Sequence, residues 1–125
     1  MPAVARDYAA RGVRDLHINS NDAERYPGDA PAAMAARVAA GEFAGPYLRD
    51  ERQEVARAWD ACVTPDVFVL DGERRLAYRG APDADYEDPS LAAAWLRDAL
   101  DAVLAGGPPP RAQTEPRRCS IKWRP

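Results

Sequence analysis

An unbroken apolar run from Val67 to Leu70 lies at the centre of the hydrophobic pattern. Short runs of this kind, rich in β-branched and aromatic residues, are typical of buried β-strands. Asp71-Gly72 follows at once and favours a tight hairpin turn, and the large apolar residues Leu76 and Tyr78 then lie two positions apart, as in a strand. The pattern predicts a buried strand, a turn and a half-exposed returning strand.

A stripe of apolar residues at helical spacing follows this hairpin. Asp88-Pro89 suits a helix start, because the carboxylate can act as N-cap and proline fits the first helical position. Gly106-Gly107 ends the pattern. The buried face of the predicted helix consists of Ala92, Trp95, Leu96, Ala99, Leu100, Val103 and Leu104.

The first half of the chain predicts one strand, over residues 13–19, and three shorter helices. Asp50 and Gln53 form a capping-box pattern in front of the third helix, whose buried face would carry Val55 and Trp59. The remaining segments are helices over Val4 to Arg11 and over Ala32 to Ala40, and an edge segment at Tyr47-Leu48.

The predicted order of elements is helix, strand, helices, strand, strand, helix and tail. This order predicts an α/β fold in which helices cover a small sheet. The 125 residues, 46% of them hydrophobic, fit a single domain. Pro108 to Pro110 form a stiff extended linker after the last helix. We therefore expect a domain over residues 1–105 and a proline-rich linker and tail over residues 106–125.

Charge and hydropathy exclude several classes of partner. The net charge of -3 argues against a nucleic-acid partner, whose phosphates must be neutralised by clustered basic residues. No stretch is long and apolar enough to span a bilayer, and the first fourteen residues lack the apolar core of an export signal. We therefore expect no membrane partner and a location in the cytoplasm. In that reducing compartment Cys62 and Cys119 would be thiols or redox partners rather than a structural disulfide.

The single histidine does not indicate a metal or acid-base site. His17 lies inside the predicted strand over residues 13–19, with no second conventional ligand or acid-base partner at hand. One histidine and two cysteines at these separations match no zinc spacing, and the glycines form no phosphate-binding loop. We therefore expect no metal and no cofactor.

Five blocks of the sequence, taken in order, carry a resemblance. They are residues 5–13, 18–27, 64–71, 76–80 and 119–123. Together they resemble the thioredoxin-fold redoxins, in particular the bacterial peroxiredoxin-like branch of the alkyl hydroperoxide reductase and thiol-specific antioxidant superfamily. The resemblance implies a thioredoxin-like fold of three layers, a small mixed sheet with flanking helices, and thiol-disulfide or peroxide chemistry.

The resemblance also assigns roles to individual residues. Thr64 and Pro65 match the family's threonine-proline loop, in which the proline is cis and substrate docks. Cys119 matches a tail cysteine of the family. Cys62 lies one place earlier than the cysteine that often precedes the threonine-proline pair, and Val63 occupies that place. Both cysteines are therefore candidate redox residues, although neither opens a helix, where a thiol pKa would be lowered.

The family's central strand and its reactive-cysteine turn have no counterpart in this sequence, so we expect an incomplete, N-terminally truncated form of the fold. In the family that strand lies between the strands that correspond to residues 13–19 and 67–70. Both would therefore present unpaired apolar edges here, which invite pairing with another chain.

Three interpretations follow from these observations. The first is a truncated redoxin oxidoreductase, with a thiol or disulfide protein as reductant or a peroxide as substrate; enzyme activity of this chain is left open, because the reactive cysteine is absent. The second is a catalytically silent module that binds a partner or itself through the exposed sheet edge. The third is a small dithiol protein in which Cys62 and Cys119 pair reversibly.

Overall fold

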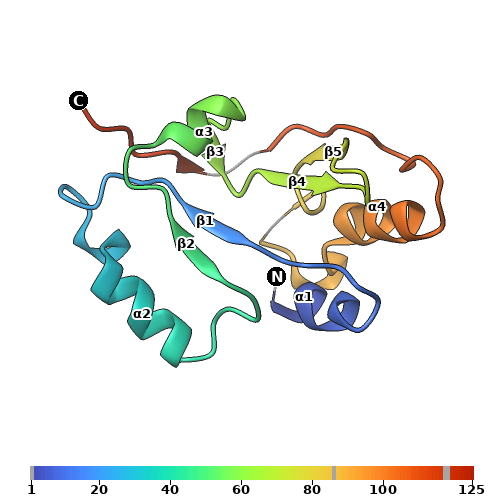
Figure 1. The fold of residues 1–125 in the computed structure, drawn as a ribbon, viewed down its shortest axis with the longest axis horizontal. Helices are drawn as coiled ribbons and strands as arrows, with labels where there is room; N and C mark the ends of the chain where they lie inside the picture. Colours follow the sequence, from blue (N-terminus) through green and yellow to red (C-terminus); the bar gives the residue numbers. More distant parts are fainter. Residues whose placement is uncertain (1, 86, 117–118) are drawn as a thin grey trace. The chain divides into compact units, whose positions relative to one another are not determined.

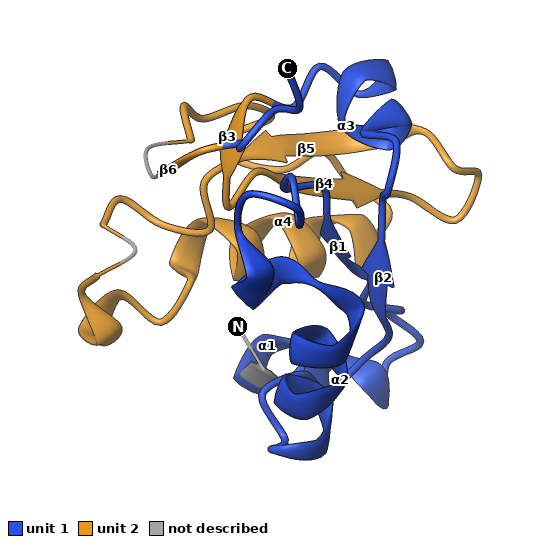
Figure 2. Cartoon of the chain, turned by 90° about the vertical axis from the view of Figure 1, so that its left-hand side faces the viewer, with its two compact units in different colours: residues 1–61, 121–125 blue, residues 62–120 orange. Residues whose placement is uncertain are grey.

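The computed structural model describes residues 2–85, 87–116 and 119–125 (Figure 1). The chain divides into two compact units (Figure 2). Unit 1 comprises residues 1–61 and 121–125, and unit 2 comprises residues 62–120. The predicted α/β class is confirmed, because both units combine helices with short strands. The boundary predicted after residue 105 stays a prediction.

Unit 1 is built from three α-helices, a 3-10 turn and a parallel pair of strands. Val4 and Tyr8, four residues apart on the first helix, are both buried, as helical spacing predicts. The strand predicted over residues 13–19 is shorter in the structure. The elements are α1 (Pro2–Ala9), β1 (His17–Asn19), η1 (Pro27–Asp29), α2 (Pro31–Ala39), β2 (Tyr47–Arg49) and α3 (Glu54–Ala58).

The predicted buried face of α3 is wrong. Val55 is 40% exposed and Trp59 is 41% exposed, whereas Ala56 is buried. The helix is only five residues long and begins at Glu54, later than the capping-box pattern indicates. The carboxylate of Asp50 still caps it, by accepting hydrogen bonds from the backbone N–H groups of Val55 and Ala56.

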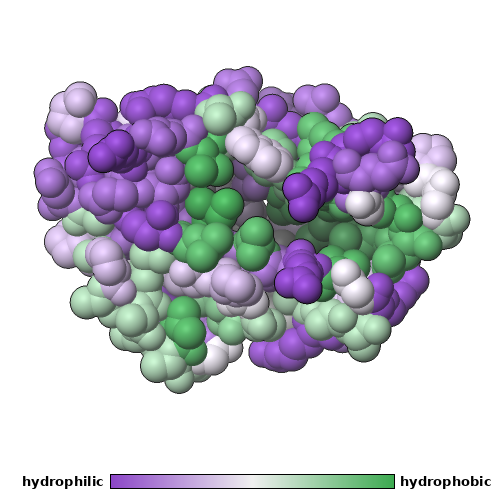
Figure 3. Space-filling view, in the orientation of Figure 1, coloured by the Kyte–Doolittle hydropathy of each residue, from purple (hydrophilic) through white to green (hydrophobic). Residues whose placement is uncertain are grey.

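The two faces of the β1–β2 pair have opposite character. Ile18 lies opposite Leu48 in the parallel register, and both side chains are exposed. On the other face Asn19, opposite Arg49, is buried. Parallel strands are usually covered on both sides, so the exposed apolar face of this pair is unusual. Figure 3 colours each residue by its hydropathy and shows that hydrophobic residues reach the molecular surface on the side that it displays.

Unit 2 is an antiparallel hairpin with one helix packed against both of its strands. The two predicted strands are confirmed as β4 and β5, but β4 is not buried throughout, because Val69 is buried whereas Leu70 is exposed. Tyr78 of the returning strand is fully buried. Residues 112–114 run alongside β5, with hydrogen bonds to Arg79. The elements are β3 (Val63–Thr64), β4 (Val67–Leu70), β5 (Leu76–Gly80), η2 (Pro89–Leu91), α4 (Ala94–Leu104) and β6 (Cys119–Ser120).

The hairpin turn is longer than Asp71-Gly72 predicts. Asp71 N–H donates to Arg75 O, and the residue with positive φ is Arg74, at 64°, not Gly72. One carboxylate oxygen of Asp71 accepts hydrogen bonds from the N–H groups of Glu73 and Arg75, so this side chain organises a wider loop.

The predicted helix start at Asp88-Pro89 produces only the 3-10 turn η2. Asp88 does cap this turn, by accepting a hydrogen bond from Ser90 N–H. Ala92 and Ala93 then adopt left-handed backbone angles, and α4 starts afresh at Ala94. The new start is stabilised by the buried carboxylate of Asp83, which accepts a hydrogen bond from Ala93 N–H. Leu96, Ala99 and Leu100 of the predicted stripe are buried.

The strands of the described residues form three two-stranded sheets, whereas the sequence predicts one small mixed sheet. Within those residues β1 pairs only with β2, and β4 only with β5. Each of these strands therefore has an edge that no described strand pairs with. Residues 117 and 118 of the predicted tail lie outside the described residues.

Candidate functional site

The antiparallel pair β3–β6 brings three of the four predicted site residues together. Val63 lies opposite Ser120, and Thr64 lies opposite Cys119. Thr64 Oγ1 also donates a weak hydrogen bond to Cys119 O, at 3.4 Å. The peptide bond to Pro65 is cis, as the resemblance implies. Proline has no N–H to donate, so the ladder ends here and the Thr64–Pro65 corner lies beside Cys119.

Cys62, the fourth predicted site residue, directly precedes β3. Exposure alternates along this segment, because Cys62 and Thr64 are exposed while Val63 is half-buried. Cys62 and Thr64 therefore share one face of the strand. Cys119 lies opposite Thr64 on that face, which makes the two cysteines diagonal neighbours. Both cysteines are exposed and neither is in a disulfide.

Diagonal neighbours in an antiparallel pair have Cα atoms about 7–8 Å apart. A disulfide needs Cα atoms within about 6.8 Å. In this register Cys62 and Cys119 therefore lie just outside disulfide range, and a shift of about 1 Å in the ladder would bring them within reach. A two-residue ladder is short enough to allow such a shift.

The loop after the threonine-proline pair is held by a buried ion pair. Asp66 is almost completely buried, and its Oδ2 lies 3.2 Å from Arg79 Nη2 on β5. The guanidinium of Arg79 also lies over the ring of Phe68, 5.0 Å from its centroid. These contacts, all within unit 2, fix the corner that carries Thr64 and Pro65.

His17 has a carboxylate partner, Asp15, that the sequence pattern did not single out. Its Nε2 lies 2.6 Å from Asp15 Oδ2, although without the alignment of a hydrogen bond. The imidazole also packs edge-on against Phe43, with ring centroids 4.9 Å apart. The signal was available, because residues i and i+2 of a strand share a face. Both cysteines belong to unit 2 and His17 belongs to unit 1.

The described residues hold no group of three or more histidine, cysteine, aspartate or glutamate side chains that could bind a metal ion. None of the described helices is long and apolar enough to cross a membrane.

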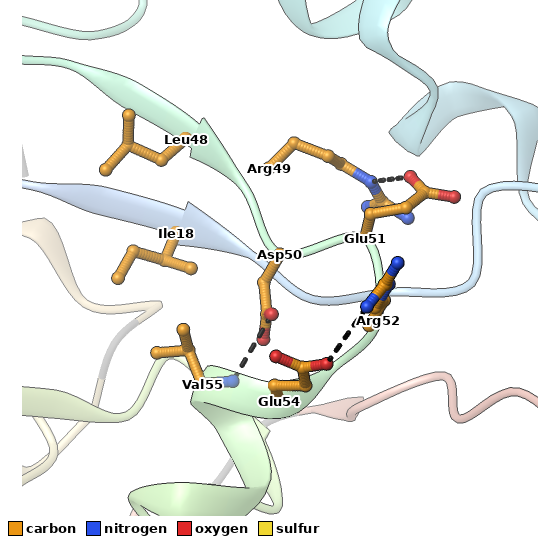
Figure 4. Close-up of a pocket in the computed structure, with 8 residues that line it drawn as sticks. All are labelled: Ile18, Leu48, Arg49, Asp50, Glu51, Arg52, Glu54 and Val55. Atoms are coloured by element: carbon orange, nitrogen blue, oxygen red, sulfur yellow. Dashed lines mark hydrogen bonds and ion pairs between the residues drawn. The ribbon is translucent and has the colours of Figure 1, made fainter.

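Unit 1 contains an open pocket of about 460 Å³ beside the exposed apolar face of β1–β2 (Figure 4). Its apolar lining consists of Ile18, Leu48 and Val55. The charged groups at its rim pair with one another: Arg49 Nε lies 3.2 Å from Glu51, and Arg52 lies 3.8 Å from Glu54. The pocket therefore suits an apolar side chain better than a charged ligand.

No family model and no curated protein matches the chain. Solved structures match almost all of it, including the following two. An uncharacterized conserved protein from Geobacillus kaustophilus is 42% identical, with a TM-score of 0.92, over 99% of this chain and 67% of that chain. A hypothetical protein from Sinorhizobium meliloti is 40% identical, with a TM-score of 0.90, over 98% of this chain and 68% of that chain. Neither name states a function.

Proposed function

The chain belongs to the same family as the uncharacterized conserved protein from Geobacillus kaustophilus and the hypothetical protein from Sinorhizobium meliloti, and for this member we propose thiol-disulfide exchange at the β3–β6 surface. The observation that carries the proposal is the register that places Cys119 opposite Thr64. Cys119 is one reacting thiol, Cys62 is the second, and Thr64 and Pro65 form the docking corner for the substrate. We include in this proposal the thioredoxin-like fold that the resemblance implies.

The proposed reaction needs no metal or cofactor. A thiolate of the protein attacks a disulfide of the substrate, which forms a mixed disulfide and releases one substrate thiol. The second protein thiolate attacks the protein sulfur of the mixed disulfide and releases the other substrate thiol. Two electrons pass to the substrate and a Cys62–Cys119 disulfide remains. A dithiol of a reductant protein restores the starting state by the same steps in reverse.

Exposure and surroundings favour disulfides over peroxides as substrates. Both sulfur-bearing residues are exposed, so a bulky disulfide can reach them. Neither cysteine opens one of the described helices, which is the setting that activates a single thiol. A pair of neighbouring thiols on an exposed strand face fits exchange with another protein. Such thiols also fit a reducing compartment, and we therefore propose the cytoplasm as the location.

The test is oxidation of the reduced protein with glutathione disulfide, followed by intact mass measurement. The proposal predicts the loss of two hydrogens in the wild type and a stable glutathione adduct in both Cys62→Ser and Cys119→Ser. A wild type that only accumulates two glutathione adducts would refute it.

A second candidate function is self-association through the β1–β2 pair. The specific observation is the exposed apolar face of Ile18 and Leu48, together with an edge of β1 that pairs with no described strand. Addition of a strand from a second copy would satisfy the backbone groups of that edge, and packing of the two apolar faces against each other would remove them from water. Sedimentation of the protein over a range of concentrations tests this function: a monomer at all concentrations would exclude it.

A further inference from the structure

The C-terminal tail, residues 121–125, is held in unit 1 like a bound peptide, although unit 2 lies between the tail and the rest of unit 1 along the chain. Lys122 N–H donates to Asn21 Oδ1 at 2.9 Å, and Lys122 O accepts from Asp22 N–H at 2.7 Å. Both contacts use backbone groups of the tail. Unit 1 therefore recognises this segment in the way that a protein recognises an extended peptide.

Gln53 contacts the backbone of the tail at two separate points. Its side chain is completely buried, its Nε2 donates to Lys122 O at 2.9 Å, and its Oε1 accepts from Arg124 N–H at 3.0 Å. The same Nε2 also donates to Ser20 O at 2.8 Å. A buried amide that loses its partners is costly, so unit 1 is stable only with this site filled.

The side chains of the tail add selectivity to these backbone contacts. Ile121 is buried, and the guanidinium of Arg57 lies 5.2 Å from the centroid of the Trp123 ring. The guanidinium of Arg124 pairs with Glu51. The site thus fits an apolar residue followed, two places on, by tryptophan and arginine, a pattern that occurs once in the sequence.

The site lies at the end of the β1–β2 pair. Asn21 and Asp22 follow β1, and Gln53 follows β2. The two strands are parallel, so these residues meet at the same edge. Ligands of open α/β sheets bind outside the carboxyl ends of parallel strands. The tail therefore occupies the place of a ligand.

The tail can be exchanged between copies without loss of these contacts. Each of them joins residues 121–125 to unit 1, and the tail is joined to unit 2 only through β6, a strand of two residues. Exchange of an identical terminal segment between copies is a low-cost route to association, because the same contacts form again.

We propose that this site is an interaction surface for a second copy of the chain, which docks its own residues 121–125 there in place of the resident tail. Concentration decides between the two arrangements. A tail of the same chain competes at an effective concentration on the order of mM, so the single chain prevails in dilute solution. The inference is independent of the thiol exchange and of the exposed apolar face of β1–β2.

The test mixes two full-length variants, each of which lacks one half of the contact. Gln53→Glu keeps the tail, but its carboxylate faces Lys122 O, where the amide had donated. Ile121→Asp keeps the site, but it places a charge on the buried residue of the tail. One variant is isotope-labelled, a reducing agent prevents disulfides between chains, and native mass spectrometry counts the dimers that contain one chain of each kind.

We expect the mixed dimer to have a dissociation constant at least about tenfold lower than that of Ile121→Asp mixed with Gln113→Glu. Gln113→Glu is the matched control, because it makes the same change at an exposed glutamine and keeps its own tail docked. Equal dissociation constants for the two mixtures, with all variants folded by circular dichroism, would overturn the proposal. A mixed dimer no more abundant than dimers of one variant alone would also overturn it, because association would then use another surface.

A second measurement needs no substitution and so does not depend on the folding of a variant. A synthetic peptide of residues 120–125 is added to the isotope-labelled wild type at about 10 mM, above the effective concentration of the resident tail. The amides of Lys122 and Arg124 should lose their protection against hydrogen exchange, whereas the Asp22 amide should keep it, because the peptide supplies the same carbonyl. Tail amides that stay protected would contradict the proposal.

Discussion

Thr64 and Cys119 face each other across the β3–β6 pair, although 55 positions separate them in the chain. Their pairing places a thiol beside the threonine-proline corner and brings the second cysteine, Cys62, to the same exposed face. The proposed exchange chemistry depends on this register.

A disulfide between Cys62 and Cys119 should stabilise the protein. Unit 2 starts at Cys62 and ends at Ser120, so the bond would close almost the whole unit into a loop. Closing a loop of this length lowers the entropy of the unfolded chain by an amount worth about 4 kcal/mol. We expect a higher urea midpoint for the oxidised than for the reduced protein, and no such difference in Cys119→Ser. Equal midpoints in a wild type shown to be oxidised would contradict the diagonal geometry.

Thr114→Val should destabilise unit 2 much more than Thr64→Val. Thr114 Oγ1 accepts a hydrogen bond from Ala81 N–H at 2.8 Å and lies 2.7 Å from the buried hydroxyl of Tyr78. Valine leaves Ala81 N–H unsatisfied, which costs about 1–3 kcal/mol of unfolding free energy, whereas the Tyr78 hydroxyl keeps its hydrogen bond to Ala81 O. Thr64 is exposed and makes one weak hydrogen bond, so its replacement should cost under about 1 kcal/mol. Urea unfolding of the two variants checks the order, and the reverse order would be inconsistent with the structure.

Asp50 should make the stability of unit 1 sensitive to acid. Burial alone would raise the pKa of this carboxyl, but hydrogen bonds from Ala56 N–H, Ser20 Oγ and Val55 N–H together lower its pKa below the ordinary value of 3.8. A carboxyl whose pKa is lower in the folded than in the unfolded state stabilises the protein at any pH above its unfolded-state pKa. This stabilisation is lost as the pH falls through the folded-state pKa.

Asp50→Asn tests this assignment. The variant should be less stable than the wild type at pH 7 by about 1 kcal/mol, because the amide NH2 group that replaces one carboxylate oxygen cannot accept a hydrogen bond. The two proteins should converge as the pH falls below about 4, where the wild-type carboxyl becomes protonated. Urea unfolding at a series of pH values measures the difference, and a constant gap between the curves would argue against a capping carboxylate.

Leu48→Lys should weaken self-association through the β1–β2 pair. The substitution places a charge in the centre of the exposed apolar face formed with Ile18, and a charge is costly to bury there. Leu76→Lys makes the same change at another exposed leucine, on β5 of unit 2, and serves as control. Sedimentation should show a rise in the dissociation constant of at least about tenfold for the first variant. An equal effect of both variants would indicate nonspecific association.

Sequence periodicity predicts the regular part of the fold well. The unbroken run Val67–Leu70 is β4, and the helical stripe supplies the buried residues Leu96, Ala99 and Leu100. Periodicity fails where side chains form hydrogen bonds with the backbone. The Asp71 and Asp83 carboxylates reshape the hairpin loop and the start of α4, and neither effect has a periodic signal.

Only part of the candidate site could be predicted from the sequence. Thr64, Pro65, Cys62 and Cys119 could be named from the resemblance, but their pairing could not, because two-residue strands carry no hydrophobic alternation. Gln53 was missed for a related reason. Its local spacing to Asp50 indicates a capping box, whereas its partners Lys122 and Arg124 are far away in the sequence.

The most direct measurement is the disulfide map of the oxidised protein. The protein is equilibrated with glutathione disulfide, blocked, digested without reduction and analysed by tandem mass spectrometry. The proposed exchange site predicts one linked pair of peptides, containing Cys62 and Cys119, within a single chain. Separate peptides that each carry glutathione, or a link between two chains, would contradict the proposed exchange site.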